Sequence, residues 1–335
     1  MIAHDSNITH SYAARLNSFK NGIEKSGIKR AGVLGLLERA AQVKGLNAVD
    51  LNFPDHCIGT TSKDLKSTLG DLGLSVNGFA MRYYSDPGFK LGAFTNPDPK
   101  LRRLAIDQTK RGVDQLNELG GSLMTLWMGQ DGFDYSFQVD YGRLWDFTLE
   151  AMAEVADHNK ACEISIEYKP NEPRSFSLMP DIGTTLLAIN QVGRKNVGVT
   201  IDFAHVLYAD EMPAYAVALA ARSSKLFGVH LNDGYGKRDD GLMVGTVHPV
   251  QTIELLYVLD AIQYNRAIYF DTFPDITGMD PVAECAANIA TVEAMRRVVQ
   301  RLKADNLLSA AIAAQDAVTS NSIIRNAIYG GVSSA

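Results

Sequence analysis

Four segments of the sequence that are typical of β-strands each end in an ionisable side chain. Glu167 follows a β-branched segment, and Asp202, His230 and Asp271 end three later ones. Three carboxylates and an imidazole that converge would repel one another unless a cation compensates their charge, and oxygen ligands with one nitrogen suit Mn²⁺, Mg²⁺ or Co²⁺. The spacing therefore predicts a site for a divalent metal, with Mn²⁺ as the first choice.

Each of these residues also has a purely structural interpretation. Asp202 could cap the next helix, His230 could be a core histidine with satisfied hydrogen bonds, and Asp271 could be a turn residue. Agreement among four separate strand ends favours the metal site over four unrelated explanations.

Further charged residues cluster near these strand ends. Lys169 and Glu172 follow Glu167 within the stretch IEYKPNEPR, residues 166–174, and such a cluster is costly unless it is used; the alternative is a solvated salt bridge. His205 comes three residues after Asp202. The loop after His230 contains Asp233, Asp239 and Asp240, which could hold a second cation or form a solvated acidic loop.

Short apolar strands alternate with longer helical patterns along the chain, which is typical of βαβ units and a parallel sheet. Eight such units predict a (β/α)8 barrel, whose strands all end on the face that carries the active site. The predicted domains are a barrel over 1–303 and a C-terminal helical extension over 304–335. The long polar segment 82–99 is expected to form a lid or a pocket wall. The predicted strands cover 13–19, 48–52, 74–81, 122–127, 164–168, 197–202, 226–230 and 267–271, and the predicted helices cover 31–43, 62–72, 100–119, 141–159, 181–192 and 281–302.

Composition excludes several classes of function. Among 335 residues, 32 are Lys or Arg and 38 are Asp or Glu, so the net charge is −6, and no basic run marks a nucleic-acid site. No apolar run approaches the roughly eighteen residues of a membrane span, and the first residues lack the blocks of a signal peptide. We therefore expect a cytoplasmic protein that contacts neither membranes nor nucleic acids.

At these residues the chain resembles the xylose isomerase-like TIM-barrel superfamily, which includes sugar isomerases, ketose 3-epimerases and the endonuclease IV group. The stretch IEYKPNEPR is similar to the Glu-x-Lys-Pro-Asn-Glu-Pro-Arg at the fifth strand of xylose isomerases. The resemblance implies that Glu167 binds a metal and that Lys169 polarises a sugar oxygen. It also implies that Asp202 bridges two metals, that His205 binds one of them, and that His230 and Asp271 belong to the first metal site. Taken together, the expected catalytic residues are Lys169, Glu167 and Asp202; the expected substrate contacts are Asn52, Phe53, Trp127, Glu172 and His205; the expected metal ligands are Glu167, Asp202, His230, Asp271, His205 and Asp239.

The sequence departs from the isomerase pattern at two places. Asn52 stands where the isomerases have a histidine that contacts the ring oxygen of the sugar, although His56 follows four residues later. This departure puts in doubt whether the protein opens a sugar ring. The second-metal loop of the family has two aspartates separated by one residue, whereas here Asp239 and Asp240 are adjacent. The second metal is therefore weak, absent or held by Asp240.

The activity that the resemblance implies is interconversion of an aldose and a ketose on a small sugar, by hydride shift with two metals or through an enediolate with one. The alternatives are a ketose 3-epimerase and a lyase subunit that cleaves C-glycosides with a small partner protein. A phosphodiesterase would need a basic groove and more histidines, and a sugar-binding protein without activity is a further alternative. We expect a homo-oligomer, because a helical tail outside a barrel commonly packs on a neighbouring chain.

Overall fold

Eight parallel strands close into a barrel in this computed structural model, which describes residues 11–330. Around the barrel the strands follow the order β1, β10, β9, β8, β6, β4, β3 and β2, so the last strand pairs with the first. This arrangement confirms the predicted (β/α)8 barrel. The strands are β1 (Tyr12–Arg15), β2 (Ala48–Phe53), β3 (Ser75–Met81), β4 (Leu123–Trp127), β6 (Glu163–Glu167), β8 (Val197–Asp202), β9 (Leu226–Leu231) and β10 (Ile268–Phe270).

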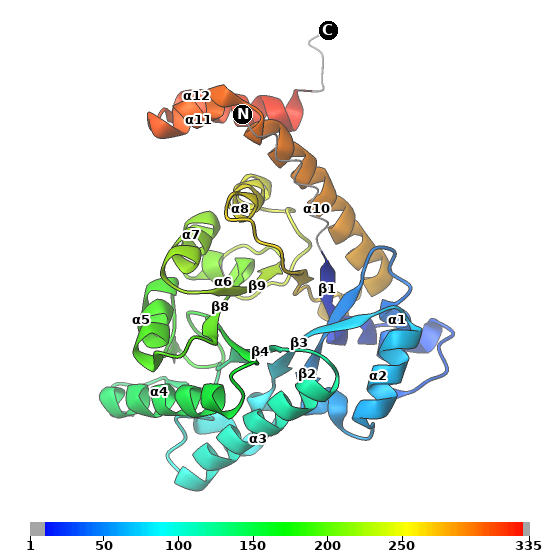
Figure 1. The fold of residues 1–335 in the computed structure, drawn as a ribbon, viewed down its shortest axis with the longest axis vertical. Helices are drawn as coiled ribbons and strands as arrows, with labels where there is room; N and C mark the ends of the chain where they lie inside the picture. Colours follow the sequence, from blue (N-terminus) through cyan, green and yellow to red (C-terminus); the bar gives the residue numbers. More distant parts are fainter. Residues whose placement is uncertain (1–10, 331–335) are drawn as a thin grey trace.

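Helices surround the barrel on its outer face (Figure 1). Their apolar sides are turned inward; α3, for example, buries Ala105, Ile106, Val113 and Leu116, which share one face at helical spacing. The bounds are α1 (Gly32–Ala40), α2 (Ser62–Asp71), α3 (Pro99–Glu118), α4 (Tyr141–His158), α5 (Ile182–Val192), α6 (Phe203–Tyr208), α7 (Pro213–Ser223), α8 (Pro249–Ala261), α9 (Pro274–Thr277) and α10 (Pro281–Lys303).

Strand β6 shows how the barrel separates apolar from polar side chains. Alternate residues on a strand point to opposite faces, so Ile164 and Ile166 face the helices while Glu163, Ser165 and Glu167 face the barrel interior. In the middle layer, the Ser165 hydroxyl lies 2.6 Å from the hydroxyl of Thr200 on β8. The two ionisable residues of the strand are therefore placed at opposite ends of the barrel.

The first strand is shorter than predicted. The sequence suggested a strand over 13–19, but β1 ends at Arg15 and a 3-10 helix follows over Leu16–Lys20. Leu16 and Phe19 are both fully buried, and their spacing of three residues suits one turn of helix rather than the alternation of a strand. Arg15 consequently stands at the active-site end of the strand.

The segment 82–99 packs against the barrel as a wall. Phe89 and Phe94 are buried against Tyr83, with ring centroids 6.0 and 5.5 Å from that of Tyr83. Two 3-10 helices shape the segment, Tyr83–Ser85 and Pro87–Leu91. A small antiparallel pair that the sequence did not predict, β5 (Gly132–Phe133) with β7 (Phe176–Ser177), lies beyond the ends of β4 and β6.

The C-terminal region is helical, as predicted. Helix α10 continues past the barrel and leads to α11 (Asn306–Ala313) and α12 (Ala317–Tyr329), which lie outside the ring of helices (Figure 1). The expected packing of this extension on a second copy of the chain stays a prediction. None of the helices described between residues 11 and 330 is long and apolar enough to cross a membrane.

Candidate metal centre and substrate cavity

The four strand-end residues converge on one point at the C-terminal end of the barrel. One ligand atom from each of Glu167, Asp202, His230 and Asp271 lies within 4.8 Å of the other three. Nδ1 of His230 is 3.4 Å from Glu167 Oε1, 3.8 Å from Asp202 Oδ2 and 3.9 Å from Asp271 Oδ2. The neighbouring strands β6, β8 and β9 supply one residue each and Asp271 directly follows β10, which is why distant parts of the sequence meet here.

Atoms of this cluster lack partners within the protein. Nδ1 of His230 and Oδ1 of Asp271 are buried and accept or donate no hydrogen bond among the described residues. Buried polar atoms are normally satisfied, because leaving one unpaired costs about 1–3 kcal/mol. A set of three carboxylates and one imidazole with unused electron pairs fits a hard or borderline divalent cation.

The electrostatics of the cluster also fit a missing positive charge. Burial lowers the pKa of His230, but the carboxylates of Glu167, Asp271 and Asp202 outweigh burial and raise it to about 9. Burial raises the pKa of Asp271 to about 7, although the Arg15 guanidinium opposes the shift. The cluster therefore retains protons where a bound cation would provide the compensating charge.

Asp202 caps the next helix, which is one of the two roles that the sequence left as alternatives, and it also lies in the four-residue cluster. Its Oδ1 accepts a hydrogen bond of 3.0 Å from the backbone N–H of His205 and so caps helix α6. Its oxygens also accept bonds of 3.2 and 3.0 Å from the amide of Asn232, a fully buried residue that the sequence analysis missed. These bonds fix the direction of the carboxylate before any ligand arrives.

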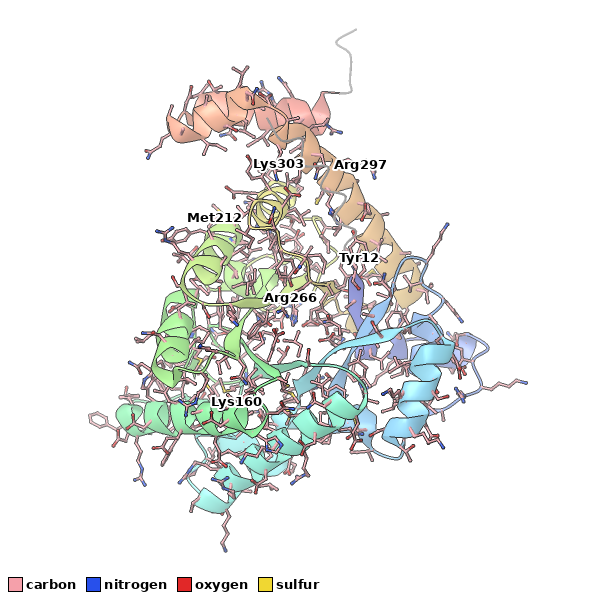
Figure 2. The ribbon with its side chains drawn as sticks, in the orientation of Figure 1. Tyr12, Lys160, Met212, Arg266, Arg297 and Lys303 are labelled. Carbon is pink, nitrogen blue, oxygen red and sulfur yellow. The ribbon has the colours of Figure 1, made fainter. Side chains whose placement is uncertain are left out.

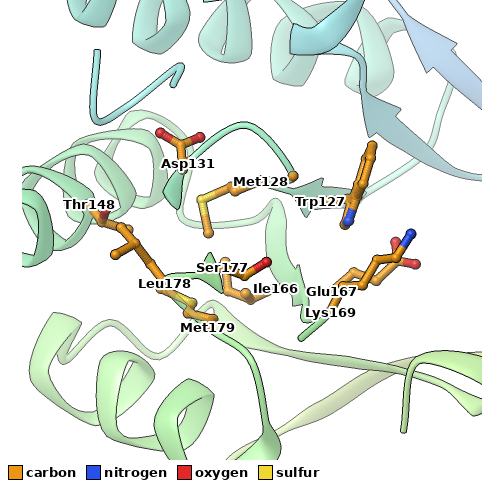
Figure 3. A pocket seen from close by; sticks show the side chains of 11 residues that line it. Trp127, Met128, Asp131, Thr148, Ile166, Glu167, Lys169, Ser177, Leu178 and Met179 are labelled. Atoms are coloured by element: carbon orange, nitrogen blue, oxygen red, sulfur yellow. The ribbon is translucent and has the colours of Figure 1, made fainter. Parts of the chain in front are cut away.

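Lys169 lies beside the cluster with its charge intact. Its Nζ is 3.2 Å from Asp239 Oδ2 and 2.9 Å from Glu172 Oε2, and it stands 5.3 Å from the ring centre of Trp127. Burial lowers the pKa of Lys169, but Asp239 and Glu172 outweigh burial and raise it. Figure 3 shows Lys169 and Glu167 next to each other at the end of β6, with Trp127 of β4 alongside. An ammonium group is thus held next to the metal position.

His205 and Asp239 form a pair next to the four-residue cluster rather than within it. The His205 ring bonds the Tyr168 carbonyl through Nδ1 at 3.0 Å, which leaves Nε2 facing Asp239 Oδ2 at 3.1 Å. Asp240 is occupied within its own loop, because it accepts bonds from the backbone of Tyr235 and from Arg238, both 2.8 Å long. This geometry favours one complete metal site and leaves two ligands for a second.

A cavity of about 240 Å³ opens above the cluster. Asn52 and Trp127 contribute to its walls, as expected, and His205 and Asp239 line it near the metal ligands. The remaining lining residues were not predicted; they are Arg15, Asp50, Ala80, Met81, Arg82, Tyr84, Tyr269 and Phe273. The site therefore uses all eight strands or the loops next to them.

Two of the expected substrate contacts, Phe53 and Glu172, are not among the residues that line this cavity. Phe53 packs on Phe79 in the core, with ring centroids 6.0 Å apart, because its strand position points to the helices while Asn52 points inward. Glu172 contacts Lys169 from the outside, with 41% of its side chain exposed. His56 accepts a bond of 2.9 Å from the backbone of Asn52, and burial lowers its pKa to about 3, so it serves the structure as a neutral ring.

Signals for the missed residues were present in the sequence. Asp50 is two residues before Asn52 on the same strand and therefore shares its inward face. Arg82 directly follows the end of β3. Arg15 ends β1 but was hidden because the predicted strand continued to residue 19. A search of every strand end for polar residues of either charge would have found them.

Comparison with known proteins agrees with this geometry. The family profile described as "Xylose isomerase-like TIM barrel" matches residues 37–304. The chain belongs to this family. The xylose isomerase of Thermus thermophilus is 32% identical over 212 residues, which cover 62% of this chain and 55% of that protein. The enzyme of Thermus caldophilus is 30% identical over a stretch of the same length.

Solved structures with the same fold cover nearly the whole barrel. A D-tagatose 3-epimerase-like protein superposes with a TM-score of 0.70 at 16% identity, covering 87% of this chain and 98% of that one. An L-ribulose 3-epimerase gives a TM-score of 0.67 at 16% identity, covering 87% and 96%. The chain spans about half the length of the xylose isomerases that it matches, 55% in both cases.

Proposed function

We propose that the protein is a divalent-metal-dependent sugar isomerase that interconverts an aldose and its ketose. The observation that supports this most directly is the group of four residues whose ligand atoms lie within 4.8 Å, two of which, His230 and Asp271, each have a buried atom without a hydrogen-bond partner. Membership of the xylose isomerase-like family supports the substrate class. Mn²⁺ is the first choice of metal, with Mg²⁺ and Co²⁺ as alternatives.

The chain's own residues divide the work of the reaction. Glu167, Asp202, His230 and Asp271 hold the cation, which when bound supplies Lewis-acid polarisation of the sugar oxygens. The ammonium of Lys169 adds positive charge next to the same position and stabilises a developing negative oxygen. With one complete site, hydrogen would move between adjacent carbons as a proton, and the carboxylate of Glu167, which lines the cavity, would transfer it.

A ketose 3-epimerase is the second candidate. One complete four-residue site supports it, because proton transfer on a single metal is the chemistry that an epimerase requires. The structures named as ketose 3-epimerases share the fold at 16% identity or less. Asp271 stands where the resemblance to that branch leads one to expect a glutamate, and this favours the isomerase.

The dimensions of the cavity argue for a small substrate. Its volume of about 240 Å³ is below the roughly 300–1,000 Å³ of pockets for drug-sized ligands. Arg82 and Tyr84 of the segment 82–99 form part of its wall. A free monosaccharide suits this space better than the bulky glycoside that a C-glycoside lyase would take.

The test begins with the metal content of the purified protein, followed by a screen of aldoses and ketoses in D₂O with added Mn²⁺. Conversion of an aldose to its ketose with deuterium incorporated at carbon supports an isomerase that transfers a proton. Conversion of one ketose into another identifies the epimerase. A protein that binds no divalent metal under any of these conditions contradicts both.

A further inference from the structure

Two arginines line the substrate cavity, and only one of them is neutralised by carboxylates. Arg15 stands with Nη1 2.8 Å from Asp275 and Nε 3.7 Å from Asp271. Its charge therefore helps to compensate the acidic cluster. The positive charge of Arg15 in the cavity therefore has a role in the acidic cluster already described.

Arg82 has no such partner. Its side chain forms no ion pair with any residue in the described part of the chain, and its Nε is buried without a hydrogen-bond acceptor. The guanidinium carbon lies 4.5 Å from the ring centre of Tyr84, a stacking contact that orients the fork but does not neutralise it. An arginine that keeps unused donors at the wall of a cavity is ready to bind an acceptor there.

The position of Arg82 relates it to the metal cluster. It follows β3, and β3 lies four strands away from β9 in either direction around the eight-stranded ring. His230 is on β9, so Arg82 and His230 face the same cavity from opposite sides, while Glu167 on β6 is two strands from β3. A substrate whose oxygens reach the cluster would present its far end to the guanidinium.

We propose that Arg82 binds an anionic group of the substrate, a carboxylate or a phosphate, at the end of the sugar opposite the metal. This inference rests on the proposed function, since it assigns the substrate class of the same site. Both groups match the planar fork of a guanidinium, which can donate two parallel hydrogen bonds to their oxygens. The natural substrate is then a sugar acid or a sugar phosphate rather than a neutral sugar.

A neutral sugar would leave the charge of Arg82 uncompensated. Hydroxyl groups can accept hydrogen bonds from the fork, but they bring no negative charge into a partly enclosed space. Asp55, which bonds to Ser85 at 3.1 Å, is the acidic residue near the outer end of this wall, and it forms no ion pair with Arg82. Because no carboxylate of the described residues pairs with Arg82, an anion that pairs with it would come from the ligand.

The experiment compares three probes by calorimetry on the Mn²⁺-loaded protein and on the metal-free protein. The probes are a neutral pentitol, the matching pentonate and the matching pentitol phosphate. We expect at least one anionic probe to bind roughly tenfold or more tightly than the pentitol, since a hydrogen bond to a charged group contributes about that factor. Which anion gains more distinguishes a sugar acid from a sugar phosphate.

Variants locate the preference. Arg82→Gln should remove the advantage of the anionic probe and leave pentitol binding nearly unchanged, and Arg82→Lys should retain part of it. Arg222→Gln on α7, an exposed residue, is the matched control for the loss of one positive charge. If Arg82→Gln does not fold, the probe-specific loss in Arg82→Lys decides the question.

Two results would overturn the proposal: equal binding of all three probes to the wild-type protein, or an anion preference that survives in both Arg82 variants. Neither result touches the isomerase proposal, which fails separately if no divalent metal binds.

Discussion

Strand β6 carries one glutamate at each end, and the two are treated differently by the fold. At the N-terminal end of the barrel, Glu163 accepts two hydrogen bonds from Arg266, of which Nη2 to Oε1 is 2.7 Å long. The guanidinium also lies 5.1 Å from the ring centre of Phe227, and Figure 2 shows Arg266 inside the ring of helices. At the other end, Glu167 faces His230 and two further carboxylates, where partners are missing.

The difference shows what marks a functional charge in this barrel. An inward direction alone does not, because both glutamates point from the same strand into the barrel interior. Glu163 belongs to a closed pair that can only stabilise, whereas Glu167 belongs to a group with electron pairs left for a ligand. Each prediction below tests one consequence of that distinction.

Exchange of the two glutamates for glutamine should give the largest contrast. Glu167→Gln removes a negatively charged ligand, so we expect bound metal to be lost and activity to fall more than about 10³-fold, because weakening only a partner of a ligand typically costs 10- to 100-fold. Metal content by mass spectrometry and turnover of the identified substrate measure the effect.

Glu163→Gln is the matched control on the same strand. It should keep its full metal content and most of its activity, because its carboxylate contacts Arg266 and lies at the opposite end of the barrel. Comparable metal loss in both variants would mean that the distinction between the two ends is wrong.

Asp131 tests whether an unpartnered oxygen is sufficient to mark a ligand site. Its Oδ1 accepts three hydrogen bonds, from Ala93 N and from Thr95 N and Oγ1, while Oδ2 is buried without a partner. Burial raises its pKa from 3.8 to about 6. The folded protein thus binds this proton more tightly than the unfolded chain, so the stability it contributes is present below pH 4 and is lost as pH rises through 6.

Asp131→Asn should remove this loss. A shift of two pKa units corresponds to roughly 3 kcal/mol. The difference in free energy of unfolding between Asp131→Asn and wild type should therefore rise by about that amount, in favour of the variant, from pH 4 to pH 7.5. Urea titrations at both pH values measure it. Asp157 is an exposed partner of Arg194, which lowers the pKa of the Asp157 carboxyl. For Asp157→Asn, the difference in free energy of unfolding from wild type should therefore change with pH in the opposite direction. A pH-independent difference for Asp131→Asn would show that the oxygen is ionised in the fold.

Much of the barrel could be predicted because its strands are apolar, short and separated by amphipathic helices. For β8, the predicted and the observed strand both begin at residue 197 and end at residue 202. The first unit was less accurate, since Leu16 and Phe19 are apolar in either a strand or a 3-10 helix and only tertiary packing decides between them. The pair formed by β5 and β7 depends on contacts between two loops, which no local pattern encodes.

The convergence of Glu167, Asp202, His230 and Asp271 could be predicted from the sequence because a parallel barrel brings every strand end to one face. The cavity was only partly predictable. Whether Asn52 or Phe53 faces inward depends on the register of one strand, and a shift of one residue reverses the answer. Asn232, which orients Asp202, has a role that appears only when the loop after β9 is placed in space.

The closed pair at the N-terminal end should affect stability and nothing else. Arg266→Met leaves Glu163 without its partner. We expect the free energy of unfolding to fall by about 1–2 kcal/mol, between the values for an exposed and a buried pair, because 38% of the Arg266 side chain is exposed. Urea denaturation measures the loss. Metal content should not change, and a decrease in bound metal would show that the two ends of β6 are coupled.

Glu172→Gln should have the smallest effect and sharpens the comparison within the site itself. Glu172 lies 2.9 Å from Lys169, but 41% of its side chain is exposed, so water can replace much of its interaction. Asp239, at 3.2 Å and 15% exposed, continues to hold the ammonium in place. We expect turnover to fall less than about threefold, the effect of an exposed ion pair worth under 1 kcal/mol. Asp239→Asn is the comparison variant and should reduce turnover more; a larger loss in Glu172→Gln would mean that the exposed carboxylate, and not the buried one, positions Lys169.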